Sequence, residues 1–258
     1  ERKEENMKAY FIGGLGCNRF YPQDFFDSLH FPVVYLDMYD SKLKERLTSL
    51  QALKDWFVAQ VDMEDDILLI AHSLGADLAV YLTSVYDNIM HLVLLDGGYI
   101  DMDKICPLNV EIEDALNYLQ TNTYRNLEGA IIAEKQNATV WSENIERAVK
   151  KSFVFDEVQR YWHLNFSEIL LTRLLTIRRQ TTGKLSLLQN RNVILFIPRV
   201  NQSTPIRKQN ALKNIPDFID ILEVSGCGHS LYTEKPKEIA ALLRDKIDTN
   251  RLFDKKET

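Results

Sequence analysis

The sequence of 258 residues is poor in cysteine, in glycine and in long apolar runs. Its three cysteines (Cys17, Cys106 and Cys227) are odd in number and far apart, which excludes a disulfide framework and a C-x-x-C metal site. A reducing, cytoplasmic compartment is therefore the expected location. No apolar run approaches the roughly 18–20 residues that a membrane span needs, so we expect no span.

The chain also has no block of lysine and arginine. Its formal net charge is −6 at pH 7, and an acidic balance without basic clusters argues against nucleic acid as the main partner. The segment ahead of Met7 is charged, and we expect no secretory signal there. Because 45% of the residues are hydrophobic, the chain can fill the core of one large domain, which excludes a disordered or collagen-like protein.

The ten glycines are concentrated rather than spread along the chain. Glycine is needed where φ is positive or where the backbone must approach another group closely. Eight of the ten lie just after runs that resemble buried strands, which indicates a site at the strand ends rather than flexible loops. These eight are Gly13, Gly14, Gly16, Gly75, Gly97, Gly98, Gly226 and Gly228.

Short apolar runs alternate with amphipathic stretches, a pattern typical of a parallel α/β sheet. The runs predict strands at residues 8–12, 31–36, 66–71, 91–95, 192–198 and 218–224. The amphipathic stretches predict helices at residues 23–29, 47–61, 74–85, 206–213 and 237–247.

Residues 99–188 interrupt this alternation. They show helical periodicity and no convincing strand, with helices predicted near 111–120, 142–151 and 167–179. We therefore predict one α/β core formed by residues 7–96 and 189–248, with an all-helical cap inserted at residues 97–188. The polar tail, 249–258, is expected to fray.

The strongest local motif surrounds Ser73. A buried run, Ile67-Leu68-Leu69-Ile70, leads into Ala71-His72-Ser73-Leu74-Gly75 and then into a helix. This is the strand–turn–helix context of a nucleophile elbow, which raises the serine hydroxyl above the sheet at a helix N-terminus. Ala71 replaces the first glycine of the usual pattern and is still small enough. The alternative is a Ser-x-Gly that merely begins a helix.

A second motif, Ser225-Gly226-Cys227-Gly228-His229, follows the last predicted strand. Histidine is the natural base for a serine because it titrates near neutral pH, and the flanking glycines allow the loop to bend over the strand ends. A lone histidine is as often structural as catalytic, but its place after Ser73 in the chain favours the base.

A third motif, Gly13-Gly14-Leu15-Gly16, directly follows the first predicted strand. Such a loop can expose backbone N–H groups, and those of Leu15 and Leu74 could together form an oxyanion hole. A glycine-rich loop here also suggests a dinucleotide-binding fold. That alternative is weak because the G-x-G-x-x-G spacing is missing and only Asp37 could contact a ribose.

Together the three motifs resemble the α/β-hydrolase superfamily, from Lys8 to Ile247. The resemblance implies a mostly parallel sheet, here of about six strands because the usual N-terminal strand pair is missing, and a lid inserted near Leu95. It implies a Ser–His–acid triad with Ser73 as nucleophile and His229 as base. Leu15 and Leu74 would supply the oxyanion-hole N–H groups. No metal or organic cofactor is implied.

The triad acid departs from the family pattern. Its usual place, after the strand at 192–198, falls on Asn201, which can orient an imidazole but carries no charge. Replacing the acid by asparagine costs on the order of 10⁴ in rate in serine proteases. The best replacement is Asp96, at the end of the neighbouring strand on the same sheet edge. A cap carboxylate, Asn201 as orienter, or no functional acid are the alternatives.

The favoured function is a serine hydrolase that cleaves a carboxylic ester or thioester. Large side chains in the cap suit a small to medium apolar acyl substrate. Because of Asn201, a catalytically weak or inactive hydrolase-fold ligand-binding protein is a second hypothesis. Carbon–carbon hydrolysis or acyl transfer with the same residues is a third.

Overall fold

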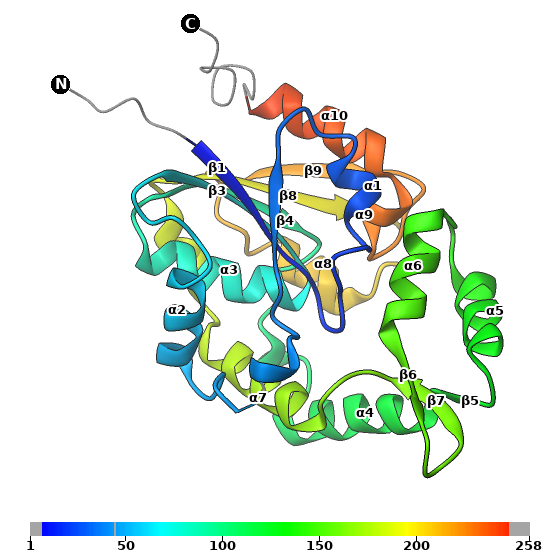
Figure 1. Cartoon of the computed structure of the whole chain (residues 1–258). Coiled ribbons are helices and arrows are strands. Elements are labelled where there is room, and N and C mark those ends of the chain that lie inside the picture. The colour runs from blue at the N-terminus through cyan, green and yellow to red at the C-terminus, as the bar shows by residue number, and fades with distance from the viewer. Residues whose placement is uncertain (1–6, 44, 248–258) are drawn as a thin grey trace, which may run out of the picture.

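A six-stranded sheet forms the centre of the computed structural model, which describes residues 7–43 and 45–247 (Figure 1). The strand order is β2-β1-β3-β4-β8-β9, and all neighbouring strands are parallel. The predicted six-stranded parallel sheet is confirmed, whereas the tail predicted to fray lies outside the described residues. The strands are β1 (Met7–Ile12), β2 (Val33–Leu36), β3 (Asp66–His72), β4 (Ile89–Leu95), β8 (Asn192–Pro198) and β9 (Asp220–Val224).

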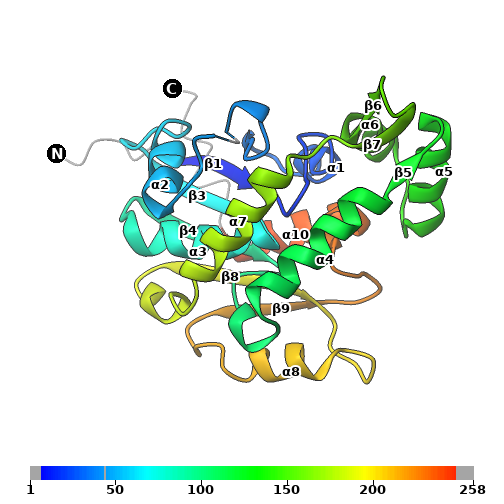
Figure 2. The same cartoon turned by 90° about the horizontal axis from the view of Figure 1, so that it is seen from below.

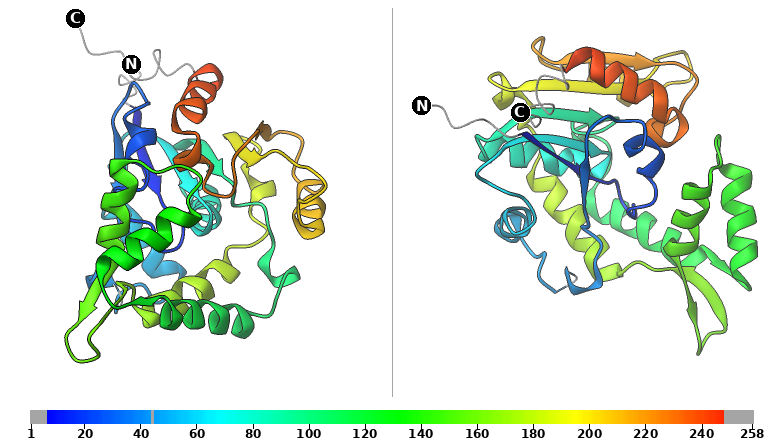
Figure 3. Two further views of the ribbon diagram at one scale, coloured as in Figure 1. Left: turned by 90° about the vertical axis from the view of Figure 1, so that its right-hand side faces the viewer. Right: turned by 45° about the horizontal axis from the view of Figure 1, so that its top comes forward.

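Helices cover both faces of the sheet, which explains why the strands are near-continuous apolar runs (Figures 1 and 3). One face, with Phe11 and Leu68, packs against α1 (Gln23–Phe26), α9 (Leu231–Glu234) and α10 (Pro236–Lys246). The other face, with Leu69 and Leu94, packs against α2 (Leu50–Val58), α3 (Leu74–Val85) and α7 (Glu168–Gln180). Among the described residues, no helix is long and apolar enough to span a membrane.

The segment between β4 and β8 crosses the carboxyl edge of the sheet and extends beyond one end of it (Figure 2). Its apolar helix α7 joins the main core, whereas α5 and α6 form a small core of their own with β6. Its elements are η2 (Met102–Lys104), α4 (Leu108–Thr121), β5 (Thr123–Tyr124), α5 (Leu127–Asn137), α6 (Glu143–Ser152), β6 (Phe153–Asp156), β7 (Tyr161–Leu164), α7 and η3 (Leu185–Leu188). Two elements outside it are η1 (Ser41–Leu43) and α8 (Ile206–Leu212).

We had predicted that this segment would be all-helical, and that prediction is wrong. The segment contains a three-stranded antiparallel sheet in the order β5-β7-β6. The aromatic residues of β6 and β7 suit a pleated surface, and the two strands are joined by a tight turn in which Arg160 has a φ of 59°. The sequence showed no convincing strand in this segment because strands of two to four residues are too short to show a clear period of two.

Two arginines of α7 tie the inserted segment together. Arg179 is buried, with 6% of its side chain exposed, and pairs with Glu111 of α4 and with Asp103 at 2.8 Å. Arg178 pairs with Glu111 and, at 3.8 Å, with Asp77 of α3. These pairs connect α4 and α7 to the core helix that follows Ser73.

We expect Arg179→Met to lower the free energy of unfolding by about 3 kcal/mol, because removing one partner leaves buried carboxylate charge less well compensated. Urea denaturation measures the change. Lys104→Met is the control, since the Lys104 side chain is 81% exposed and its pair with Asp101 should contribute little. Equal stabilities of the two variants would contradict a structural role for Arg179.

Candidate active site

The carboxyl ends of four strands bring the predicted motifs together. The loop after β1 carries Leu15, the turn after β3 carries Ser73, Asp96 directly follows β4, and the loop after β9 carries His229. Parallel strands place such loops at one edge of a sheet, where α/β proteins bind their ligands. The structure therefore gathers residues that are far apart in the chain: Ser73 and His229 alone are separated by 156 positions.

Ser73 lies on a strained turn between β3 and α3. Its backbone has φ 52° and ψ −123°, a region that residues other than glycine rarely adopt. Close backbone approaches make this turn possible: a Cβ on Gly97 would lie 2.5 Å from the carbonyl oxygen of Ser73. The turn presents a partly exposed hydroxyl at the N-terminus of α3, as a nucleophile elbow does.

A chain of hydrogen bonds joins Ser73, His229 and Asp96. The Ser73 Oγ lies 2.9 Å from His229 Nε2, and His229 Nδ1 lies 2.8 Å from Asp96 Oδ2. The His229 side chain is 56% exposed, so a substrate can reach it, whereas Asp96 is only 4% exposed. This is the geometry in which a base can take a proton from a serine while a carboxylate orients the imidazole and stabilises its charged form.

Asp96 has two further partners that the sequence analysis missed. Lys208 Nζ lies 2.7 Å from its Oδ1, and the Tyr99 hydroxyl donates to Oδ1 at 3.0 Å. Burial alone would raise the pKa of Asp96, but the hydrogen bonds from His229 and Lys208 outweigh it and lower the pKa below its usual value. Asp96 is therefore an anion at neutral pH. Lys208 is 112 residues away in the chain, and no local motif marks it.

Asn201 does not take part in this arrangement. It is exposed, and its Oδ1 accepts hydrogen bonds from the backbone N–H and the hydroxyl of Ser203, so its side chain closes its own loop. The far nitrogen of the His229 ring contacts Asp96. The structure thus assembles the predicted set of Ser73, His229 and Asp96 and leaves Asn201 apart.

His72 lies behind the imidazole of His229. Its Nε2 is 3.0 Å from the carbonyl oxygen of His229, and the two rings lie 4.7 Å apart. Burial, with repulsion from His229, lowers the pKa of His72 from 6.5 to about 3. His72 is therefore neutral at working pH and supports the loop that carries His229.

The glycine-rich loop after β1 lies directly against Ser73. A Cβ on Gly14 would lie 3.0 Å from the Cβ of Ser73, so only glycine fits there without displacement. Tyr39 fixes the loop by donating to the Gly14 carbonyl at 2.6 Å. Within the described residues, neither the N–H of Leu15 nor that of Leu74 has a backbone acceptor. Both N–H groups are thus without a backbone partner in this part of the chain.

A cavity of about 400 Å³ extends from this loop to the inserted segment. Leu15 and Cys17 of the loop form one wall, although Ser73 itself does not line it. Apolar and aromatic side chains dominate the remaining lining: Tyr21, Tyr39, Ala115, Tyr118, Leu119, Phe153, Leu164, Phe166 and Leu171. The cavity therefore suits an apolar group held next to the oxyanion loop.

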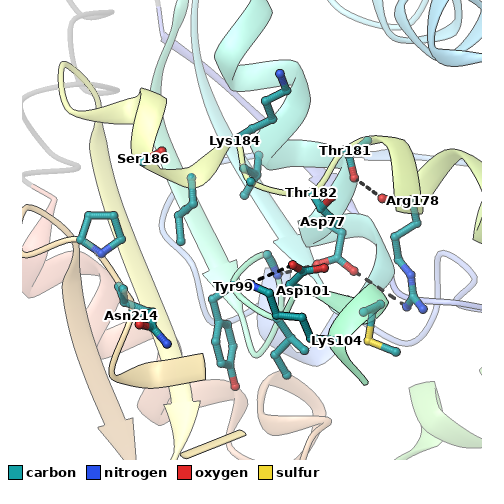
Figure 4. Close-up of a pocket in the computed structure, with 18 residues that line it drawn as sticks. Asp77, Tyr99, Asp101, Lys104, Arg178, Thr181, Thr182, Lys184, Ser186 and Asn214 are labelled. Atoms are coloured by element: carbon teal, nitrogen blue, oxygen red, sulfur yellow. Dashed lines mark hydrogen bonds and ion pairs between the residues drawn. The ribbon is translucent and has the colours of Figure 1, made fainter. Parts of the chain in front are cut away.

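A second cavity, of about 220 Å³, is lined by Tyr99, Asp77 and Arg178 (Figure 4). Figure 4 shows the Asp77 carboxylate directed toward the Arg178 guanidinium. Asp77 also accepts a hydrogen bond from the Gly98 N–H at 2.9 Å, which fixes the chain just beyond Asp96. Burial raises the pKa of Asp77 to about 6, although the Arg178 charge opposes this shift.

Cys17 and Cys227, the two cysteines near the loops of the site, do not provide a competing nucleophile. Cys17 is buried, and burial raises the pKa of its thiol to about 12. Burial also raises the pKa of Cys227. Because the thiolate is the reactive form, both side chains stay in the unreactive thiol form at neutral pH.

Known proteins similar to this chain are found by structure and not by sequence. No protein-family model matches the chain, and no curated protein matches it significantly in sequence. A crystal structure of E-2-(acetamidomethylene)succinate hydrolase is similar with a TM-score of 0.72 and 14% identity, over 96% of this chain and 93% of the other. A thioesterase domain from the curacin biosynthetic pathway has a TM-score of 0.68 and 19% identity, over 94% and 92%. An esterase of a marine microorganism has a TM-score of 0.60 and 13% identity, over 95% and 96%.

These similarities cover nearly the whole of each chain, and the sheet and its helical layers agree with them. The chain therefore has the α/β-hydrolase fold, as its three motifs predicted. At 13–19% identity, the similarity is one of fold.

The low pKa of His72 predicts a specific pH dependence of stability. Between about pH 6.5 and pH 3, the unfolded chain binds a proton at this histidine and the folded chain does not, so stability falls as the pH falls. We expect His72→Gln to make the slope of unfolding free energy against pH smaller, by up to about 1.4 kcal/mol per pH unit. Urea denaturation at several pH values measures it, with the exposed His30→Gln as control. An unchanged slope in His72→Gln would contradict a buried neutral His72.

Proposed function

We propose that this protein is a serine hydrolase that cleaves a carboxylic ester or thioester through an acyl-enzyme on Ser73. The observation that carries the proposal is the unbroken hydrogen-bond chain from Ser73 through His229 to Asp96, with Ser73 on a turn of positive φ. The structurally similar proteins include a hydrolase, a thioesterase domain and an esterase, which agrees with this choice.

The proposed reaction starts when the Ser73 Oγ attacks the substrate carbonyl carbon. His229 Nε2 takes the serine proton, and the Asp96 carboxylate stabilises the resulting imidazolium. The N–H groups of Leu15 and Leu74 hold the negative charge that develops on the carbonyl oxygen. The tetrahedral intermediate then expels the alcohol or thiol, which takes the proton from His229. A water molecule, deprotonated by the same imidazole, attacks the acyl-enzyme and releases the acid.

The cavity beside Leu15 is the proposed place of the acyl chain. Its volume of about 400 Å³ and its aromatic lining fit a small to medium apolar acyl group. The hypothesis of a catalytically inactive binding protein arose because Asn201 stands at the usual position of the acid. The contact between the His229 imidazole and the Asp96 carboxylate weakens that hypothesis. Carbon–carbon hydrolysis and acyl transfer use the same residues, so product analysis must separate them from ester hydrolysis.

A fluorophosphonate probe tests the nucleophile. We expect it to label the wild-type protein at Ser73 and to leave Ser73→Ala unlabelled, as determined by mass spectrometry of the labelled peptide. Labelling at another residue, or none in correctly folded protein, would count against the acyl-enzyme proposal.

The acid is tested by two matched asparagine–aspartate exchanges. Asp96→Asn should lower ester turnover by a factor of about 10³ to 10⁴, because the amide cannot stabilise the imidazolium. Asn201→Asp should leave turnover near wild type, since residue 201 closes a loop away from the imidazole. Rates are measured per mole of folded protein, because Asp96→Asn also removes the partner of Lys208. A large gain of activity in Asn201→Asp would contradict the assignment of Asp96 as the acid.

The acyl site is tested by filling the cavity. Ala115 lies on α4 and lines the cavity, so Ala115→Trp should reduce kcat/KM for an octanoyl ester relative to an acetyl ester by at least about tenfold. Ala59→Trp, at an exposed position at the end of α2, is the control. If Ala115→Trp lowered both rates equally, the acyl chain would not occupy this cavity.

A further inference from the structure

We propose that Lys208 is a positioning residue that sets the pH range in which the site works, by sharing Asp96 with His229. This inference rests on the proposed function, because it concerns the base that activates Ser73. It assigns a role to a residue on α8, the helix that follows the loop of Asn201.

The contact between Lys208 and Asp96 is close and largely buried. The Lys208 Nζ lies 2.7 Å from Oδ1 and 2.9 Å from Oδ2, and only 17% of the lysine side chain is exposed. His229 Nδ1 lies 2.8 Å from the same Oδ2. The Asp96 Oδ2 atom therefore contacts both the imidazole and the ammonium group, so the two groups share one buried charge.

This placement affects the imidazole through charge. Asp96 favours the protonated imidazole, and the ammonium of Lys208 disfavours it because like charges repel. Lys208 therefore cancels part of the effect of Asp96 on His229. The imidazole stays free to accept the serine proton at a lower pH than it would beside an unshared carboxylate. The same contact holds both oxygens of Asp96 in place, so the orientation of the imidazole is fixed as well.

Other titratable groups around His229 do not replace this effect. His72 faces it from β3 and is neutral, because burial lowers its pKa to about 3. Tyr99 donates to Asp96, and burial and the Asp96 charge keep this phenol protonated by raising its pKa. Glu234 accepts from the Gly228 N–H at 2.9 Å, in the loop of His229. Asp77, on α3, is the group that needs a control, since burial raises its pKa to about 6.

The experiment measures the rate of fluorophosphonate labelling from about pH 4 to about pH 9, in wild type and in substitutions of Lys208. Lys208→Gln keeps a hydrogen-bond donor and removes the charge, whereas Lys208→Arg keeps the charge. We expect Lys208→Gln to move the midpoint of the acid limb upward by about one pH unit, with about tenfold slower labelling below the midpoint. Lys208→Arg should keep the wild-type midpoint. Lys213→Met, an exposed lysine at the end of α8, should do so as well.

Two further measurements test whether the shifted midpoint belongs to His229. The shift should persist in the Asp77→Asn background, which excludes Asp77 as the titrating group. The ring protons of His229, followed by NMR in the same proteins, should show the same upward shift in Lys208→Gln without any need for turnover. If Lys208→Gln fails to fold, the proteins that carry Lys208→Met provide the same comparison with Lys208→Arg.

The proposal would be overturned if neutral and charged substitutions had the same midpoint, even if both slowed labelling at every pH. That result would make Lys208 a purely structural partner of Asp96. If the wild type were not labelled at all, the proposed hydrolase function would fail, whereas the NMR titration would still decide the role of Lys208.

Discussion

The contact between His229 Nδ1 and Asp96 Oδ2 connects parts of the chain that are 133 residues apart, and the arrangement of the site depends on it. Asp96 directly follows β4 and His229 follows β9, with β8 between β4 and β9 in the sheet. The contact is possible because β8 supports both sides: the Asp96 N–H donates to the Phe196 carbonyl at 2.8 Å, and the pairing of β8 with β9 fixes the start of the histidine loop. A parallel sheet thus sets the distance between acid and base, and the loop of Asn201 is free to turn outward.

The arrangement carries backbone strain at two residues and one buried charge, and the packing and hydrogen bonds around them offset both. Ser73 and Asp96 both have positive φ, at 52° and 46°, and such conformations persist only where the surroundings determine them. Here the surroundings are the two buried strands β3 and β4 and the tight approach of Gly97 to the Ser73 backbone. Asp96 is a buried charge, which is tolerated because three donors share its two oxygens.

Sequence alone predicted what is encoded locally and left open what depends on contacts across the chain. The six strands, the elbow at Ser73 and the glycine loop each occupy a few consecutive residues whose physical pattern is strong. Asp96 was one of several candidate acids, because only the folded sheet shows which carboxylate reaches the imidazole. Lys208 and Tyr99 escaped notice since a lysine on a short helix and a tyrosine in a loop have no distinctive spacing. The strands β5, β6 and β7 were missed because they are short and pair only with one another.

The inserted segment and the oxyanion loop are not independent of each other. Asn18, just beyond Leu15 and Gly16, donates to the Ala148 carbonyl at 2.9 Å and to the Ser152 hydroxyl at 3.0 Å, both on α6. These bonds fix the loop to the helix that also borders the large cavity. Asn18 thus links a helix that borders the cavity to the loop that carries Leu15, whose N–H is a proposed donor to the developing negative charge. We infer that the position of α6 and the position of this loop depend on each other through one asparagine side chain.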